Sequence, residues 1–338
     1  MTNFLPYLEF SLSLAKLGFL LNSLFGSVLI YTTLFFIKKQ FGSYKYLIVN
    51  FQVLGFTFSA IDFMFPTFMH SYNDGLYAIA FNIPFSIPTM EWLIALYTGL
   101  YSALISSLAI QFIYRYWAIQ DTRKLKYFNG FYYLIWAAYY LFFGFLWAIT
   151  AKKLYEIDDF GRIHVQKEIL KRYERNISSI AILALTPYTE KGGMHWKVVY
   201  GVAVMFGICG FQYSVILLCG RNMMKEMKQR MSVLSLMAGR LHRQFFRALV
   251  LQVTAPTIML FFPAVIIILL PFADLQFSFP TGVIQSGFTL YPAIDSIIMM
   301  ICVSEYQRIF RKCLMMCSRN GTVVKFTSKF SEETRENS

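Results

Sequence analysis

The stretch FNGFYYLIWAAYYLFFGFLWAIT, residues 128–150, contains no Asp, Glu, Lys or Arg. At about 1.5 Å of rise per residue, a helix of this length extends roughly 34 Å, which is enough to cross a hydrocarbon layer of about 30 Å. No water is present in that layer to pair with backbone N–H and C=O groups, so a helix that pairs them internally is favoured. The stretch therefore predicts a transmembrane helix.

Six further apolar runs of span length lie on either side of this stretch. They occupy residues 17–37, 46–69, 89–114, 198–220, 248–273 and 275–304. Within the seven runs only Asp62, Glu91 and Asp295 are charged. Transmembrane strands would need only about ten residues each and would alternate polar with apolar side chains, which these runs do not. We predict an all-α integral membrane protein: a seven-transmembrane helix bundle formed by residues 1–304, with a tail at 305–338.

The basic residues of the short loops predict the orientation of the bundle. Loops 38–45, 115–127 and 220–247 are rich in Lys and Arg, whereas loop 70–88 and the turn around Asp274 have none. By the positive-inside rule, the first three loops are cytoplasmic. We therefore expect the N-terminus outside and the C-terminus in the cytoplasm. The formal net charge of +13 then reflects topology and attraction to anionic lipid, and not nucleic-acid binding.

The long loop at 150–197 is predicted to be extracellular, although its charges are mixed. Lys152 and Lys153 lie directly at a helix end and argue against this placement. Asn176-Ile177-Ser178 argues for it, because it is a glycosylation sequon that is used only on the luminal side. We interpret Asn176 as a candidate glycosylation site.

The five cysteines lie in the fifth or seventh run or beyond the seventh run. Neither the start of the third run nor the long loop has one, so the disulfide that joins these two elements in rhodopsin-like receptors cannot form here. Cys313 and Cys317 follow the last run next to several basic residues and are candidate palmitoylation sites.

Motifs for catalysis or for a cofactor are missing from the sequence. The four His residues show no metal-ligand spacing, and no Gly-rich phosphate loop or nucleophile–base pair is evident. A retinal protein needs a Schiff-base Lys in the last helix, and run 275–304 has none. We therefore expect no enzymatic activity, no metal and no cofactor.

Two buried carboxylates and three prolines are the candidate functional residues of the runs. Asp62 is predicted in the outer part of the membrane and Asp295 nearer the inner end of the last helix, each facing the bundle interior because a charge in hydrocarbon is costly. Asp62 is a candidate pocket residue and Asp295 a candidate switch. Pro256, Pro263 and Pro292 mark positions where helices can bend. A purely structural role, as polar packing contacts or static kinks, stays open for all five.

Several motifs in chain order then resemble a known family. They are Gly42-Ser43-Tyr44-Lys45-Tyr46-Leu47, Met69-His70, Tyr114-Arg115-Tyr116, the segment Arg243 to Leu251 with Gln252 leading to Pro256-Thr257, and Leu290-Tyr291-Pro292-Ala293-Ile294-Asp295. In these residues the chain resembles the nematode serpentine chemoreceptors of the Str/Srj type, the group that includes the nematode diacetyl odorant receptor. Ser296 departs from the pattern, since relatives commonly have a second Pro after the Asp.

The resemblance implies an odorant or chemosensory receptor in the plasma membrane, in the cilium of a sensory neuron, coupled to a heterotrimeric G protein. It implies that Arg115, followed by Tyr116, meets the G protein, and that Tyr291 to Asp295 act as a switch in the last helix. Arg243 and Arg247, which we predict to face the cytoplasm, are further coupling candidates. An interfacial Arg that reaches toward lipid phosphate is the alternative for Arg115.

The predicted ligand is a small apolar or weakly polar molecule bound in the outer half of the bundle. Candidate pocket residues are Tyr97 and Tyr101 on the third helix, Trp92 above them, Asp62 and Phe261. The alternative for the aromatic residues is packing or contact with lipid. Two other classes of protein stay open: a ligand-gated odorant channel, which would have the inverted topology, and a small-molecule transporter.

Overall fold

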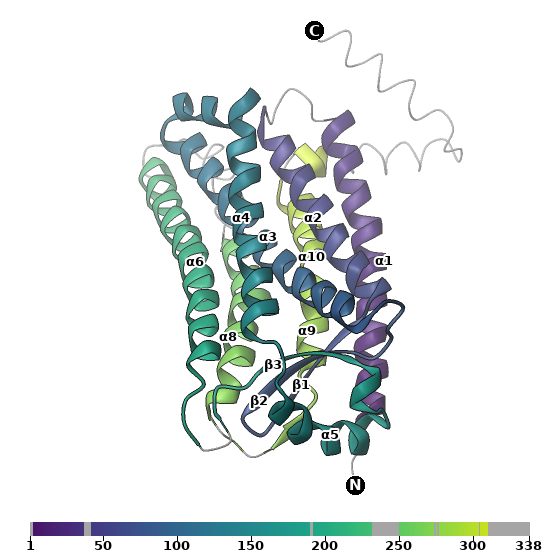
Figure 1. Cartoon of the computed structure of the whole chain (residues 1–338). Helices are drawn as coiled ribbons and strands as arrows, with labels where there is room; N and C mark the ends of the chain where they lie inside the picture. Colours follow the sequence, from purple (N-terminus) through teal and green to yellow (C-terminus); the bar gives the residue numbers. More distant parts are fainter. Residues whose placement is uncertain are drawn as a thin grey trace, which may run out of the picture.

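The computed structural model describes residues 3–36, 42–189, 192–231, 250–273, 275, 277–303 and 305–309. In this part of the chain, seven helices are long and apolar enough to cross a membrane, which confirms the predicted seven-helix bundle (Figure 1). They are α1 (Leu5–Phe35), α2 (Tyr44–Met64), α3 (Ile87–Gln120), α4 (Tyr133–Leu154, preceded by the short η2, Gly130–Tyr132), α6 (Trp196–Met231), a sixth span at Val250–Ala273, and a seventh formed by α9 (Gly282–Phe288) and α10 (Tyr291–Cys302).

The helix ends differ from the predicted ones at several places. The second helix ends at Met64, where 46–69 was predicted, because strand β1 (Thr67–Tyr72) follows it directly. The last span begins at Gly282 and not at 275, since residues 278–279 form strand β4. The first helix begins at Leu5, twelve residues before the predicted start, with Pro6 in its first turn, where a missing N–H is harmless.

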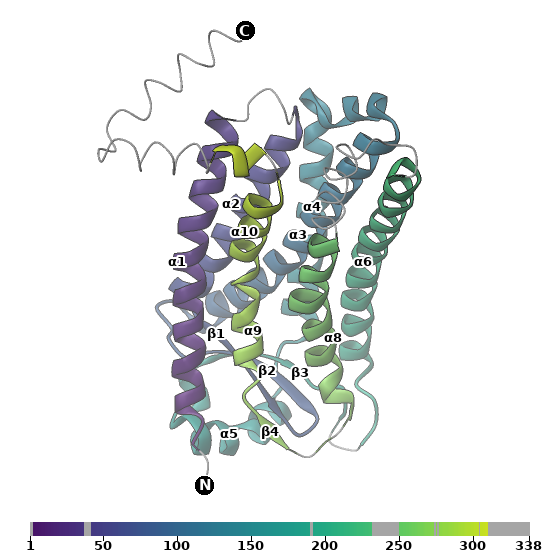
Figure 2. The same cartoon turned by 180° about the vertical axis from the view of Figure 1, so that it is seen from behind.

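A four-stranded antiparallel sheet closes one end of the bundle, which we call the sheet end (Figure 2). The sheet has the order β3-β2-β1-β4, with β2 at Gly75–Ala80, β3 at Ala181–Leu185 and β4 at Ser278–Phe279. Strands β1 and β2 come from the α2–α3 loop, β3 from the long loop and β4 from the loop before α9. All three loops at this end are therefore tied together by backbone hydrogen bonds.

Strands β1, β2 and β3 bury residues on both of their faces. Leu76 and Ala78 of β2 face the helix bundle, whereas the alternate residues Tyr77 and Ile79 pack in a second core under helix α5 (Asp159–Tyr173). Side chains of successive residues in a strand point to opposite faces, so both faces here are apolar. The long loop predicted at 150–197 thus contains a helix and a strand that cover the bundle.

The sixth span is irregular where its two prolines lie. After Pro256 a π-helical segment, η4 (Thr257–Phe261), precedes α8 (Phe262–Leu269) and the 3-10 turn η5 (Leu270–Ala273). Pro263 stands in the first turn of α8. Proline has no N–H to donate, and a π-bulge is a common way to accommodate such a break inside a helix. The irregular segment thus lies at the prolines where the sequence predicted that the helix could bend.

Candidate functional site

A cavity of about 100 Å³ lies directly beneath the sheet, inside the bundle. Ile94, Tyr97 and Tyr101 of α3 form one wall, and Trp147 and Ala151 of α4 form the next. Ala264, Ile267 and Ile268 of α8 and Gln285 and Phe288 of α9 complete it, while Leu76, Ala78, Leu183 and Leu185 line its sheet side. The lining is almost entirely apolar and aromatic, as in pockets for small organic molecules.

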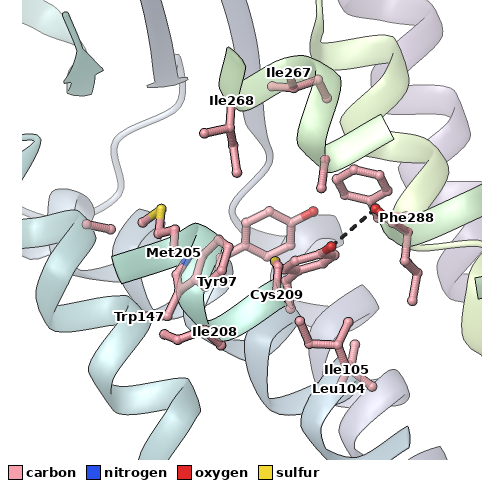
Figure 3. Packing of buried hydrophobic residues seen from close by; sticks show 14 of the residues in the cluster. Tyr97, Leu104, Ile105, Trp147, Met205, Ile208, Cys209, Ile267, Ile268 and Phe288 are labelled. Atoms are coloured by element: carbon pink, nitrogen blue, oxygen red, sulfur yellow. Dashed lines mark hydrogen bonds between the residues drawn. The ribbon is translucent and has the colours of Figure 1, made fainter. Parts of the chain in front are cut away.

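Two of the five predicted pocket residues line this cavity. Figure 3 shows Tyr97 amid the cluster, between Met205 and Phe288. Tyr101 stacks at a tilt against Trp147 and Phe288, with ring centroids 5.6 and 5.4 Å apart. Tyr97 and Tyr101 are one helical turn apart, about 40° around the axis, and so share a face of α3.

Trp92 and Phe261 do not line the cavity. Trp92 precedes Tyr97 by five residues, or about 140° around the helix, and 39% of it is exposed on the outer surface of the bundle. Phe261 is buried in η4 but packs against Tyr213, with the ring centroids 4.7 Å apart. The structure corrects both assignments: helical spacing sends Trp92 to the other side of α3, and the π segment places Phe261 against α6.

The remaining predicted pocket residue, Asp62, does not line the cavity but lies immediately behind its wall. Its carboxylate is buried beside the Tyr97 hydroxyl, which also lies next to the Gln285 amide. Among the described residues, Asp62 Oδ2, the Tyr97 hydroxyl and both polar atoms of the Gln285 amide have no hydrogen-bond partner. Buried polar groups are nearly always hydrogen-bonded, so unpaired ones beside a cavity indicate a place for a water or a ligand.

Tyr101 connects the cavity to the irregular sixth span. Its ring lines the cavity, and its hydroxyl donates to the Leu260 carbonyl of η4 at 3.2 Å. A molecule that displaces the Tyr101 ring therefore acts on the segment between Pro256 and Pro263, where the helix is already interrupted.

A buried ion pair fixes the sheet end of α3 to α4. Lys152 Nζ lies 3.0 Å from Glu91 Oε2 and 3.1 Å from Glu156 Oε1, and Arg162 of α5 approaches Glu91 at 3.8 Å. The Lys152 charge that argues against an extracellular loop is thus neutralised by two carboxylates. In a chain without cysteine at these positions, these ion pairs join α3 to the long loop.

His70 is the centre of a second polar group at the sheet end, between β1 and α5. Its Nδ1 lies 2.9 Å from the Tyr173 hydroxyl, and Phe4 packs on both rings. Burial lowers the pKa of His70 to about 4, with Arg172 adding to this effect and Glu168 opposing it. Burial alone would raise the pKa of Glu168, but hydrogen bonds from Ser278 and Arg172 outweigh it and hold that pKa below its usual value.

We expect acid to destabilise the sheet end through His70. Above about pH 6.5, His70 is neutral in both the folded and the unfolded chain. Between about pH 6.5 and 4 only the unfolded chain binds the proton, so the folded state loses stability as the pH is lowered. The loss is about 3 kcal/mol by pH 4. Thermal unfolding of purified protein at pH 7 and pH 4.5 measures it, and His70→Gln should lose clearly less stability. His164→Gln, at the same end and half-buried, is the control. An equal acid loss in wild type and His70→Gln would contradict this account.

Arg115 lies at the opposite end of α3, where it joins four helices. Its Nε donates to the Tyr44 hydroxyl of α2 at 2.5 Å, one terminal nitrogen donates to Gln252 Oε1 of the sixth span, and the other to Met299 Sδ of α10 at 3.4 Å. Gln252 Nε2 also contacts Met299 Sδ, at 2.9 Å. We call Arg115, Tyr44, Gln252 and Met299 the Arg115 cluster. An Arg that merely reached toward lipid phosphate would not have these partners inside the bundle.

The predicted switch residues of the last span lie next to the Arg115 cluster. Asp295 is buried in α10, and its charge acts on Arg115 and Tyr44, but no ion pair closer than 4 Å joins it to Arg115 within the described residues. Tyr291 is buried one turn earlier, at the break between α9 and α10. The Asp295 and Asp62 carboxylates belong to opposite ends of the bundle, as predicted.

Pro292 packs closely against α2. A Cβ on Gly55 would lie 2.5 Å from the Pro292 ring, so only glycine allows this approach. Ser296 lies 2.8 Å from Gln52 Oε1 and 2.9 Å from the Pro292 carbonyl. The serine thus adds a polar contact between α2 and α10.

The remaining candidate residues are distributed between the two ends. Tyr116 is half-buried beside Arg115. Asn176 is exposed at the sheet end, where its Oδ1 accepts from the Ser178 backbone N–H at 3.2 Å, so the sequon is accessible. The other four candidates lie outside the described residues: Arg243, Arg247, Cys313 and Cys317.

Comparison with known proteins gives concordant matches over nearly the whole chain. The family described as "Serpentine type 7TM GPCR chemoreceptor Str" matches residues 12–311. "G-protein coupled receptor str-33" of Caenorhabditis elegans is 32% identical over 325 residues, 94% of each chain. "Serpentine receptor class r-10" is 25% identical in C. elegans over 293 residues, 84% of this chain and 85% of the relative. The C. briggsae protein of the same name is 25% identical over 292 residues, 84% of each chain.

Proposed function

Because the chain belongs to the serpentine type 7TM chemoreceptor Str family, a family of G-protein-coupled receptors, we propose that it detects a small molecule and activates a heterotrimeric G protein. The ligand binds in the cavity beneath the sheet. The G protein binds at the opposite end, at the Arg115 cluster. The sheet end faces the outside of the plasma membrane of a sensory cell, and the exposed Asn176 carries a glycan there.

The observation that supports this proposal is that α3 contacts the sixth span at two levels. The Tyr101 hydroxyl donates to the Leu260 carbonyl within the π segment, and Arg115 donates to Gln252 nearer the end opposite the sheet. Pro256 and the start of the π segment lie between these contacts and Pro263 follows them, so the two halves of the sixth span can move relative to each other. A ligand that binds one arrangement of the span more tightly shifts the population toward it.

We further propose that activation makes Arg115 accessible to the G protein. In the described arrangement its guanidinium is engaged by three side chains inside the bundle. Movement of the sixth span would remove the Gln252 amide from Arg115 and expose the guanidinium to a partner. We take the described arrangement as the resting one. Coupling energies of about 1 to 3 kcal/mol between sites are typical and change a rare active population about 5- to 150-fold.

A calcium-reporter screen tests the proposed function. Cells that express the receptor together with a promiscuous G-protein α subunit are exposed to a panel of small volatile and water-soluble compounds. We expect at least one compound to raise calcium, and an inhibitor of G-protein activation to abolish that response. A compound that evokes an ionic current or its own uptake with the G protein inhibited would favour the channel or the transporter instead.

Topology gives an independent prediction. An epitope tag at residue 1 should be stained on intact cells, and one at residue 338 only after permeabilisation, because the basic short loops share the cytoplasmic side. Enzymatic deglycosylation should shift the mobility of the wild-type protein but not of Asn176→Gln. Reversed staining of the two tags would contradict the receptor proposal and would support the channel of inverted topology.

A further inference from the structure

The polar atoms at one end of the cavity specify the kind of ligand. We infer that the ligand is a small neutral molecule with a single hydroxyl group, which binds between the Tyr97 hydroxyl and the Gln285 amide while its apolar body fills the rest of the cavity. This inference rests on the proposed function, in which this cavity holds the ligand.

The size of the cavity limits the body of the ligand. An apolar cavity of about 150 Å³ holds one benzene molecule, which has six non-hydrogen atoms. The cavity beneath the sheet measures about 100 Å³ and is walled by rings and branched side chains, including Tyr101, Trp147, Ile267 and Phe288. By this comparison the cavity holds a molecule of at most about six non-hydrogen atoms, and an extended chain or a fused ring system does not fit.

The unpaired atoms of Asp62, Tyr97 and Gln285 determine the head group. The three side chains are each at least nine-tenths buried, and Tyr97 and Gln285 line the cavity. Tyr97 has one O–H, and the Asp62 carboxylate is the strongest acceptor beside it. With that proton directed to Asp62, the Tyr97 oxygen offers only acceptor capacity to the cavity, while Gln285 offers an N–H donor and a C=O acceptor. A ligand hydroxyl, which both donates and accepts, satisfies this pair.

Other head groups match the site less well. A ketone accepts from the Gln285 N–H but leaves the Tyr97 oxygen and the Gln285 carbonyl without a donor. An ammonium group would enter a cavity lined by apolar side chains, where the Asp62 carboxylate lies behind Tyr97 and does not line the wall. Burying a charge without a direct partner is far more costly than burying a hydroxyl. A hydrocarbon leaves the Tyr97 oxygen without a donor and the Gln285 amide without a partner.

Four compounds of matched size test the inference: cyclopentanol, cyclopentanone, methylenecyclopentane and cyclopentylammonium. The purified full-length receptor in lipid nanodiscs is unfolded by heat at increasing concentrations of each compound, since a ligand that binds the folded state raises the unfolding temperature. We expect cyclopentanol to bind about tenfold more tightly than methylenecyclopentane, the value of one net hydrogen bond, with cyclopentanone between them and cyclopentylammonium weakest.

Two tyrosine variants test whether the preference for cyclopentanol arises at the Tyr97 hydroxyl. Tyr97→Phe should remove the advantage of cyclopentanol and leave the binding of methylenecyclopentane unchanged. Tyr155→Phe is the matched control: its ring also lines the cavity, but its hydroxyl contacts Met205 Sδ at 3.5 Å. It should preserve the wild-type order. Each compound also partitions into the lipid of the nanodiscs. This effect is the same for all variants, so it cancels when variants are compared at equal compound concentration. Gln285→Leu serves as the second variant should Tyr97→Phe not fold.

Three results would overturn the inference: equal binding of cyclopentanol and methylenecyclopentane, tighter binding of cyclopentanone or cyclopentylammonium, or no binding by any of the four. An unchanged cyclopentanol advantage in Tyr97→Phe would overturn it as well. These outcomes are separate from failure of the proposed function, because they measure binding without a G protein. A receptor that never activates a G protein fails the proposed function whichever compound binds.

Discussion

Arg115→Ala is expected to abolish G-protein activation while the receptor still reaches the cell surface and binds its ligand. The guanidinium of Arg115 is the charged group of the cluster opposite the ligand cavity, and its loss removes the partner proposed to meet the G protein. The ligand contacts beneath the sheet are untouched, so binding should remain within about twofold of wild type. Calcium response, surface staining and ligand binding measured in the same cells separate these effects.

Two further variants sharpen this prediction. Gln252→Leu removes a restraint on Arg115 without removing the guanidinium, so basal activity should rise, by about 5- to 150-fold if the active state is rare. Arg123→Ala is the control: this arginine lies at the same end in η1 (Thr122–Phe128), but 90% of its side chain is exposed and it pairs only with Asp121 among the described residues. Loss of ligand binding in parallel with signalling in Arg115→Ala would show that the residue is structural.

Glu91→Gln is expected to have the largest effect on stability. The Glu91 and Lys152 side chains are only 6% and 8% exposed, so the substitution leaves the Lys152 ammonium buried without its closest full charge partner. Removing one partner of a buried pair typically costs about 3 to 5 kcal/mol, and because Glu156 stays 3.1 Å from the ammonium, we expect a loss below that range but above the contribution of an exposed pair. The double variant Glu91→Gln/Lys152→Met removes both charges and should recover most of the loss. Thermal unfolding of the purified variants measures these differences.

The control for this prediction is Glu156→Gln. Glu156 contacts the same ammonium at 3.1 Å, but its side chain is 54% exposed and remains in contact with water. Exposed pairs contribute about 1 kcal/mol or less. A Glu91→Gln variant that unfolds at the same temperature as Glu156→Gln would refute the assignment of the buried pair as the link between α3 and α4.

The bundle could be predicted from the sequence, whereas the sheet was missed. Seven charge-poor runs have few alternatives to helices in a membrane, because every backbone group must be paired. Strands β2 and β3 are apolar on both faces, and β1 begins in the mostly apolar stretch Phe65 to Met69, which looks like a continuation of the second helix. A signal was nevertheless present: Asn73-Asp74-Gly75 between two apolar stretches is typical of a hairpin, and Asn73 has a positive φ of 51°.

Those residues of the candidate site that lie on one helix could be predicted, because helical spacing determines which side chains share a face. Tyr97 and Tyr101 share a face of α3, and the structure places both in the cavity wall. Gln285 was missed because the sequence was searched for charges in the spans, and an amide carries none. Contacts between distant segments, such as Arg115 with Gln252 or Lys152 with Glu91, depend on how the helices pack, which no local pattern encodes.

Guanine-nucleotide exchange with purified components tests the central claim most directly. The receptor in lipid nanodiscs is mixed with a heterotrimeric G protein, and exchange is followed as an active compound from the screen is titrated. We predict that the compound raises the exchange rate at least fivefold, the lower limit of ordinary coupling between sites. We also predict that its half-maximal concentration matches the one that stabilises the receptor to heat. An exchange rate that stays the same while the compound saturates the cavity would contradict the account.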